Sequence, residues 1–179
     1  MIKLIKHTFF ILLLAGLQLG MVALFPANLG KINVLIVVLI FISMVGRFSI
    51  GTTYAFILGV ILDLYSALPF GALLVSLLFT MYVAYKIFVH FLTNKSLYTL
   101  VGLTVISTIV YNAFLYMYTA VNYLIKVKDY SLINHLTVNS INDLLWQILF
   151  NLVLSVLLFA VFNLFSRRFK AVFIDTTKQ

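Results

Sequence analysis

The sequence predicts an all-α integral membrane protein, and this prediction rests on its composition and on six long apolar runs. Hydrophobic residues make up 64% of the 179 residues, charged residues make up 9%, and the mean hydropathy is +1.19. A soluble domain of this length needs a polar surface, and this chain has too few polar residues to form one. We therefore expect a single six-helix transmembrane domain over residues 1–179.

Each helix is expected from an apolar run that is bounded by Pro, charged or polar residues. The first run ends before Pro26, and a Pro-Phe-Gly turn separates the third run from the fourth. The second run is short, and Lys31 and Arg47 at its ends can extend their charged groups to the membrane surface. The predicted spans are 8–25, 32–46, 48–68, 71–91, 97–118 and 143–165, and the longest loop is 119–142.

The distribution of Lys and Arg predicts the orientation. If the N-terminus is cytoplasmic, nine of the 12 Lys and Arg residues fall on the inner side of the membrane, including a basic segment after residue 165. Basic residues concentrate on the cytoplasmic side of membrane proteins, so both termini are expected there. The net charge of +8 is explained by this anchoring, and we expect no nucleic acid partner.

Residues that would carry catalysis or metal binding are sparse. The chain has no Cys, and its three histidines, His7, His90 and His135, have no second ligand at helical spacing. No paired carboxylates, nucleophile elbow or phosphate-binding loop is present in the sequence. We expect neither an enzyme nor a metal or cofactor site.

Small residues recur at four-residue spacing in two of the predicted spans. Gly51, Ala55 and Gly59 form one row, which leads to Asp63, and Gly16 and Gly20 form a second. Rows of this kind allow two helices to approach closely, either within one bundle or between a subunit and a partner. Packing within the bundle is the default interpretation, and our hypothesis is that the groove of Gly51, Ala55 and Gly59 binds the transmembrane helix of a partner protein.

Polar side chains of several spans are expected at one depth, toward the outer leaflet. The third span places Asp63 there, and Asp143 is expected in the first turn of the sixth helix. The cluster predicted around Asp63 draws on Gln18, Asn33, Asn112, Gln147 and Asn151. It is either a set of interhelical hydrogen bonds that stabilise packing or a ligand pocket, because ionisable groups inside a membrane often mark one.

The stretch from Phe56 to Gly71 carries a family resemblance. It resembles the pattern G-x-x-x-D-L-x-S-G-x-P-x-G that ends an apolar helix in the MreD family, the rod shape-determining membrane proteins of the bacterial cell-elongation machinery. Ala67 stands where the family commonly has Gly. The matching residues are Phe56, Gly59, Leu62, Asp63, Leu64, Ser66, Pro69 and Gly71.

The resemblance implies a non-catalytic scaffold subunit in the bacterial plasma membrane. Family members work with MreC, a bitopic membrane protein, with the cytoskeletal filament MreB, and with the RodA glycosyltransferase and its transpeptidase partner in lateral peptidoglycan synthesis. Contacts with membrane lipids and a homodimer are further expectations. The family is also similar in fold to the S components of energy-coupling-factor transporters, so the alternative function is a subunit that binds a small vitamin-like molecule.

Overall fold

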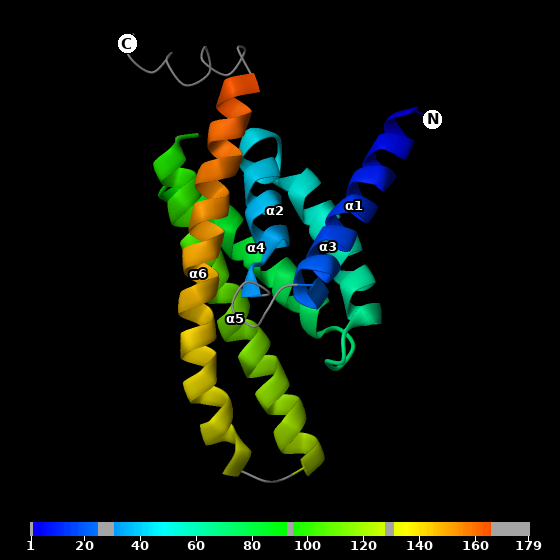
Figure 1. Ribbon diagram of the computed structural model, residues 1–179, viewed down its shortest axis with the longest axis vertical. Coiled ribbons are helices and arrows are strands. Elements are labelled where there is room, and N and C mark those ends of the chain that lie inside the picture. The colour runs from blue at the N-terminus through cyan, green and yellow to red at the C-terminus, as the bar shows by residue number, and fades with distance from the viewer. Residues whose placement is uncertain (1, 25–30, 93–94, 128–130, 166–179) are drawn as a thin grey trace.

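The computed structural model describes residues 2–24, 31–92, 95–127 and 131–165, and within these ranges it contains six α-helices and no strand (Figure 1). The all-α prediction is confirmed. The predicted Pro26 loop and the basic segment after residue 165 lie outside the described residues. The helices are α1 (Ile2–Leu24), α2 (Val34–Val45), α3 (Phe48–Tyr65), α4 (Ala72–His90), α5 (Leu97–Val127) and α6 (Ser131–Phe165).

Four of the described helices are long and apolar enough to cross a membrane. These are α3 and α4, residues Leu97–Val121 of α5 and residues Ile141–Leu164 of α6. The apolar parts of α1 and α2 are shorter. The start of α1 and the end of α6 lie at the same end of the bundle (Figure 1).

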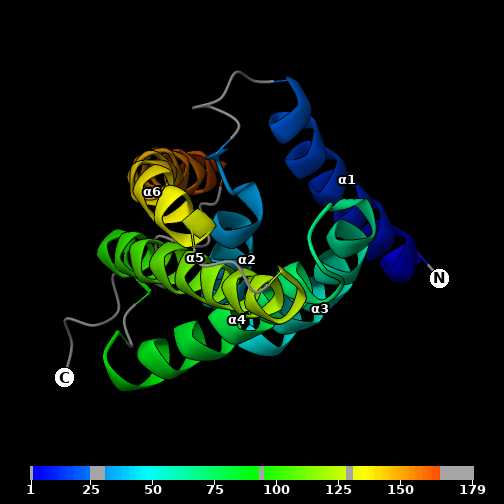
Figure 2. The same ribbon diagram turned by 90° about the horizontal axis from the view of Figure 1, so that it is seen from below.

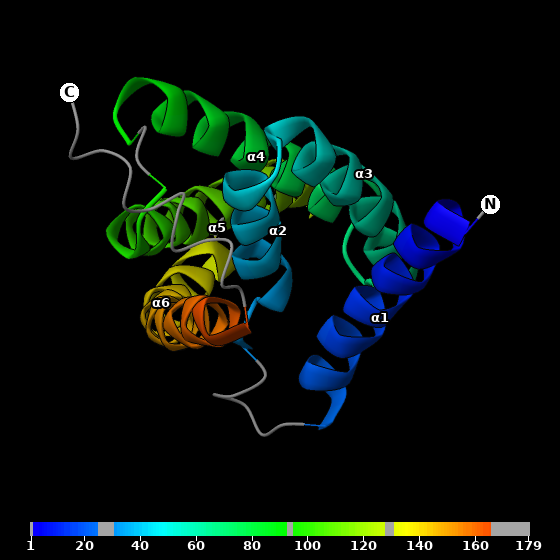
Figure 3. The same cartoon turned by 90° about the horizontal axis from the view of Figure 1, so that it is seen from above.

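Helix α2 occupies the centre of the bundle and contacts all five other helices (Figure 3). Its sequence, VLIVVLIFISMV, is apolar on almost every side, as expected for a helix surrounded by protein. The side chain of Asn33 accepts a hydrogen bond from the Ile36 amide at 3.2 Å and so caps the start of the helix. At the other end, the Lys95 Nζ donates to the Val45 carbonyl at 3.3 Å.

Helices α3 and α4 form an antiparallel pair. The small-residue row predicted on α3 is covered by residues of α2 and α4. Gly51 faces Ser43 of α2, and a Cβ on Gly59 would lie 2.8 Å from the Cα of Leu74 in α4. Ala55 is fully buried. Of the two interpretations of this row, packing within the bundle is the one that the contacts match, and a partner helix cannot lie along it.

Helices α5 and α6 extend through most of the predicted loop at 119–142. Helix α5 continues to Val127 and α6 begins at Ser131, so the expected loop was wrong over most of its length. The two helices project beyond the other four at one end of the bundle (Figure 1). The loop was predicted because the chain becomes polar there, but a helix satisfies its own backbone hydrogen bonds and can continue into water without an apolar face.

Helix α1 packs at the edge of the bundle, against α2 and α3 (Figure 2). The Nδ1 of His7 and the hydroxyl of Tyr54 form a hydrogen bond that joins α1 to α3. Gly16 and Gly20 lie on the outward side, and a Cβ on either would meet no atom within 4 Å. This second small-residue row is therefore unoccupied by the described part of the chain.

The close approach at Gly59 leads to a stability prediction. Gly59→Ala should lower the free energy of unfolding in detergent by roughly 1–3 kcal/mol, because the new methyl group meets the backbone of α4. Gly16→Ala is the matched control, since its methyl group meets nothing, and it should leave stability unchanged or raise it by up to about 1 kcal/mol. Equal effects of the two substitutions in a chemical unfolding titration would contradict the packing described here.

Candidate functional site

Asp63 lies near the end of α3, and its carboxyl group caps the start of α4. The side chain is only 4% exposed. Its Oδ1 accepts a hydrogen bond from the Leu73 amide at 2.9 Å, and its Oδ2 accepts from Gly71 at 3.1 Å and from Leu74 at 3.0 Å. The first amides of a helix have no acceptor within the helix, so Asp63 supplies from α3 what α4 lacks.

The turn between α3 and α4 accounts for the rest of the motif. Gly71 has a φ of 94°, a left-handed conformation that favours glycine. The Ser66 Oγ accepts from the Leu68 amide at 3.0 Å, and the Pro69 carbonyl accepts from the Ala72 amide at 3.0 Å. The motif residues Asp63, Ser66, Pro69 and Gly71 therefore all shape one compact helix–turn–helix connection.

A second polar group, on α2, α5 and α6, is separate from the Asp63 cap. Asn151 is fully buried; its Oδ1 accepts from the Asn33 amide at 3.0 Å and its Nδ2 donates to the Thr108 Oγ1 at 3.0 Å. One turn away, the Asn112 Nδ2 donates to both the Thr108 carbonyl and the Gln147 Oε1. These bonds join three helices through amide and hydroxyl groups.

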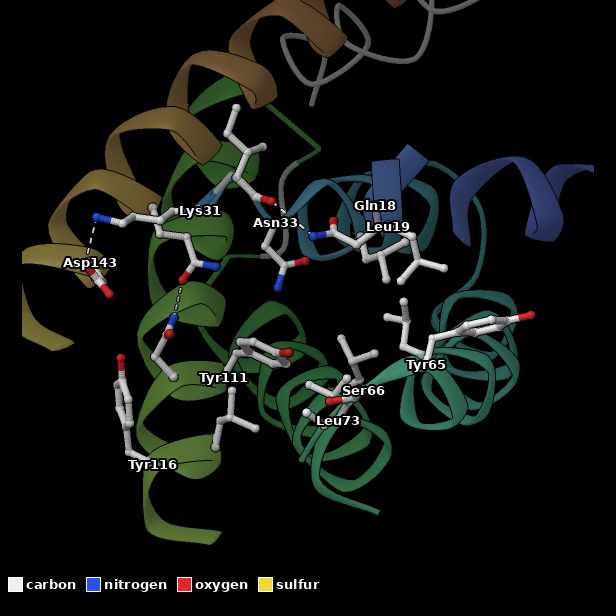
Figure 4. Close-up of a pocket in the computed structure, with 18 of the residues that line it drawn as sticks. Gln18, Leu19, Lys31, Asn33, Tyr65, Ser66, Leu73, Tyr111, Tyr116 and Asp143 are labelled. Atoms are coloured by element: carbon white, nitrogen blue, oxygen red, sulfur yellow. Dashed lines mark hydrogen bonds and ion pairs between the residues drawn. The ribbon is translucent and has the colours of Figure 1, made fainter. Parts of the chain in front are cut away.

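A cavity of about 500 Å³ lies at the same end of the bundle as the Asp63 cap, and all six helices or the residues just before them contribute to its wall (Figure 4). Leucines form much of the wall, among them Leu19, Leu35 and Leu73. Tyr65, Tyr111 and Tyr116 add aromatic rings. The polar lining residues are Gln18, Lys31, Asn33, Ser66, Asn112, Asp143 and Gln147.

An ion pair that the sequence did not indicate lies in the wall of this cavity. The Lys31 Nζ is 2.8 Å from the Asp143 Oδ1, and this contact joins the start of α2 to α6 (Figure 4). The expected place of Asp143 in the first turn of its helix was wrong, because α6 begins 12 residues earlier, at Ser131. Opposite charges at facing ends of the second and sixth predicted spans are the signal that could have suggested the pair.

Gln18 reaches the cavity from α1 with one polar atom satisfied and one not. Its Nε2 donates to the Ile32 carbonyl at 3.2 Å. Its Oε1 is buried and has no hydrogen-bond partner among the described residues. An unsatisfied buried acceptor costs about 1–3 kcal/mol, so a donor that reached this oxygen would stabilise the site.

The predicted polar cluster thus divides into two parts. Asn33, Asn112, Gln147 and Asn151 come together as expected, and Gln18 lines the same cavity as Asn112. Asp63 does not line the cavity, because its oxygens face the amides of α4. Tyr111 lies close to both Asn33 and Asp63, and it was not singled out from the sequence because a tyrosine in an apolar run gives no signal of its own.

Comparison with protein families agrees with the resemblance seen in the motif. Residues 1–169 match the family model of the rod shape-determining protein MreD, which confirms the family prediction. Comparisons with curated proteins and with solved structures find no match.

The Asp63 cap leads to a second stability prediction. Asp63→Ala should lower the free energy of unfolding by roughly 3 kcal/mol, because three amides near the start of α4 lose their acceptor. Asp63→Asn retains one acceptor oxygen and should lose only part of this amount. Thermal unfolding in detergent measures both, and an Ala variant as stable as the wild type would contradict the capping role.

Proposed function

Because the chain belongs to the MreD family of rod shape-determining proteins, we propose that it is a non-catalytic scaffold subunit of the bacterial cell-elongation machinery in the plasma membrane, where it binds the membrane helix of an MreC-like partner. The family implies a role in rod shape determination. The scaffold role and the partner are the proposed parts. Through the partner, the chain would be linked to MreB, to RodA and to its transpeptidase.

The hydrogen bonds of the polar residues support a structural role for this chain. Asp63 is the acid that the sequence presents as a candidate for chemistry, and both of its oxygens accept hydrogen bonds from α4. Asn151 likewise uses its amide group to join α2 and α5 to α6. Polar groups engaged in this way define the shape of the bundle.

The outward side of α1 is the surface that we assign to the partner. Gly16 and Gly20 meet no atom there, whereas Gly51 and Gly59 are covered by α2 and α4. Leu12 and Leu17, 59% and 49% exposed, lie on the two sides of the glycine strip. A shallow strip between larger apolar side chains allows close contact with a second membrane helix.

This assignment predicts a loss of complex formation. Gly16→Leu and Gly20→Leu should each lower the recovery of an MreC-like partner in co-purification roughly tenfold, because leucine fills the strip and keeps the two helices apart. A Cβ at either position meets no described atom within 4 Å, so thermal stability should stay near that of the wild type.

Ala160→Leu is the matched control, since Ala160 is exposed on α6, far along the chain from the strip. It should leave recovery unchanged. Undiminished recovery with Gly16→Leu and Gly20→Leu, in variants that are stably folded, would exclude the outward side of α1 as the partner surface. If self-association falls while partner recovery does not, the strip would instead belong to a homodimer.

The cavity favours a second candidate function, a subunit that binds a vitamin-like molecule. Its volume of about 500 Å³ is in the range of small-molecule sites, and it combines leucine walls with a few polar groups. In a screen of water-soluble compounds, this function predicts that one of them raises the melting temperature of the purified chain and that Gln147→Leu removes the shift. A screen without any shift would count against it.

A further inference from the structure

The charges that line the cavity balance. Lys31 and Asp143 contribute one positive and one negative group, 2.8 Å apart, and the remaining polar lining residues are neutral. Their side chains are 20% and 46% exposed, so a molecule in the cavity can reach both groups. A ligand that itself carries both charges suits this site, because its negative group can pair with Lys31 and its positive group with Asp143, which leaves no protein charge without a partner.

The buried Oε1 of Gln18 adds an acceptor that nothing in the described part of the chain satisfies. Gln18 lines the cavity together with Asn33 and Lys31 (Figure 4). A ligand with N–H donors can bond to the carboxylate of Asp143, and it can bond to the Gln18 oxygen once that side chain turns toward the cavity. A primary ammonium group has three such donors, and a quaternary ammonium group has none.

Next to the cavity, α2 has an apolar face that the described helices do not cover completely. Leu35 lines the cavity, and Val38, Ile42 and Val45 follow it at spacings of three and four residues, which places all four on one side of α2. The last three are partly exposed although α2 is the central helix. From Leu35 to Val45 this face is ~15 Å long, about half the thickness of a bilayer core.

The opening lies between α1 and α6. Both helices contact α2, but in the described part of the chain they make no contact with each other (Figure 3). Phe41 of α2 packs edge-on against Phe162 of α6 at 4.9 Å between ring centroids, which marks the α6 side of the opening. The apolar face of α2 can therefore be reached from the side, from within the membrane.

The depth of the cavity agrees with lateral access. Its lining residues Tyr65 and Asp143 lie at or next to the ends of the apolar segments Phe48–Tyr65 and Ile141–Leu164. These ends mark the boundary between the hydrocarbon core and water, where phospholipid head groups lie. The cavity thus presents its polar groups at the head-group level, and the apolar face of α2 lies at the level of the acyl chains.

We propose that the cavity binds one zwitterionic phospholipid with a primary amine in its head group. The phosphate would bond to Lys31, the ammonium group to Asp143 and the Gln18 Oε1, and one acyl chain would lie along α2 between α1 and α6. This proposal does not depend on the scaffold role, and neither the Asp63 cap nor the outward side of α1 takes part in it.

The test uses the purified full-length chain, stripped of lipid in detergent. Dioleoyl phosphatidylethanolamine and dioleoyl phosphatidylcholine have the same acyl chains and differ only in the amine. Titration of each lipid, followed by native mass spectrometry and by melting temperature, should show one phosphatidylethanolamine retained per chain and bound roughly tenfold more tightly than phosphatidylcholine. Equal affinity for the two lipids would overturn the proposal.

Variants locate the site. Lys31→Met and Asp143→Asn should each weaken phosphatidylethanolamine binding roughly tenfold and remove the preference over phosphatidylcholine. Lys86→Met is the matched control, because Lys86 is exposed on α4 and does not line the cavity. Gln18→Met leaves the ion pair intact and should also reduce the preference, so it replaces the first two variants if either fails to fold. A preference that survives all three substitutions would overturn the proposal.

The path of the acyl chain is tested separately. Phosphatidylethanolamine with a photoreactive group on one acyl chain should cross-link to Val38, Phe41 or Ile42 of α2 in preference to exposed residues of α4 such as Phe79. Cross-linking spread evenly over all exposed helices would overturn the proposal. So would a water-soluble compound that displaces the lipid and stabilises the chain in its place.

Discussion

The hydrogen bonds from the start of α4 to Asp63 are the constraint on which the rest of the bundle depends. In a membrane, water does not satisfy the free amides of a helix end, so a helix that begins near the hydrocarbon core needs an acceptor from the protein. Asp63 supplies two oxygens for three amides. This fixes where α4 starts, how sharply the chain turns after α3, and how closely the two helices pack.

Gly59 and Asp63 act on the same residue of α4. Leu74 donates its amide to Asp63, and the Cα and Cδ1 of Leu74 lie 2.8 and 2.9 Å from the position that a Cβ on Gly59 would take. Because the two residues are one helical turn apart, the absence of a side chain at Gly59 is what lets Leu74 come close enough for its amide to reach the carboxyl group. The small residue and the acid of the family motif are therefore parts of one contact.

The fold class followed directly from the sequence, since apolar runs of this length have few alternatives to helices in a membrane. The family followed from the resemblance of residues 56–71, and the convergence of Asn33, Asn112, Gln147 and Asn151 followed from their similar depth in the predicted topology. Spacing alone could not say which neighbour a polar or small side chain faces. Asp63 was grouped with the amides at its depth, but its direction is set by the approach of α4, which is a property of the packed bundle.

The two rows of small residues also show that spacing alone does not tell which neighbour a residue faces, and the difference between them bears on partner binding. Gly51, Ala55 and Gly59 on α3 and Gly16 and Gly20 on α1 have the same spacing, yet the first row is covered by this chain and the second is not. The difference arises because α3 lies between two neighbours and α1 lies at the edge of the bundle. The edge position of α1 also leaves the side of α2 toward α6 uncovered, so one arrangement creates both an exposed strip on α1 and lateral access to the cavity.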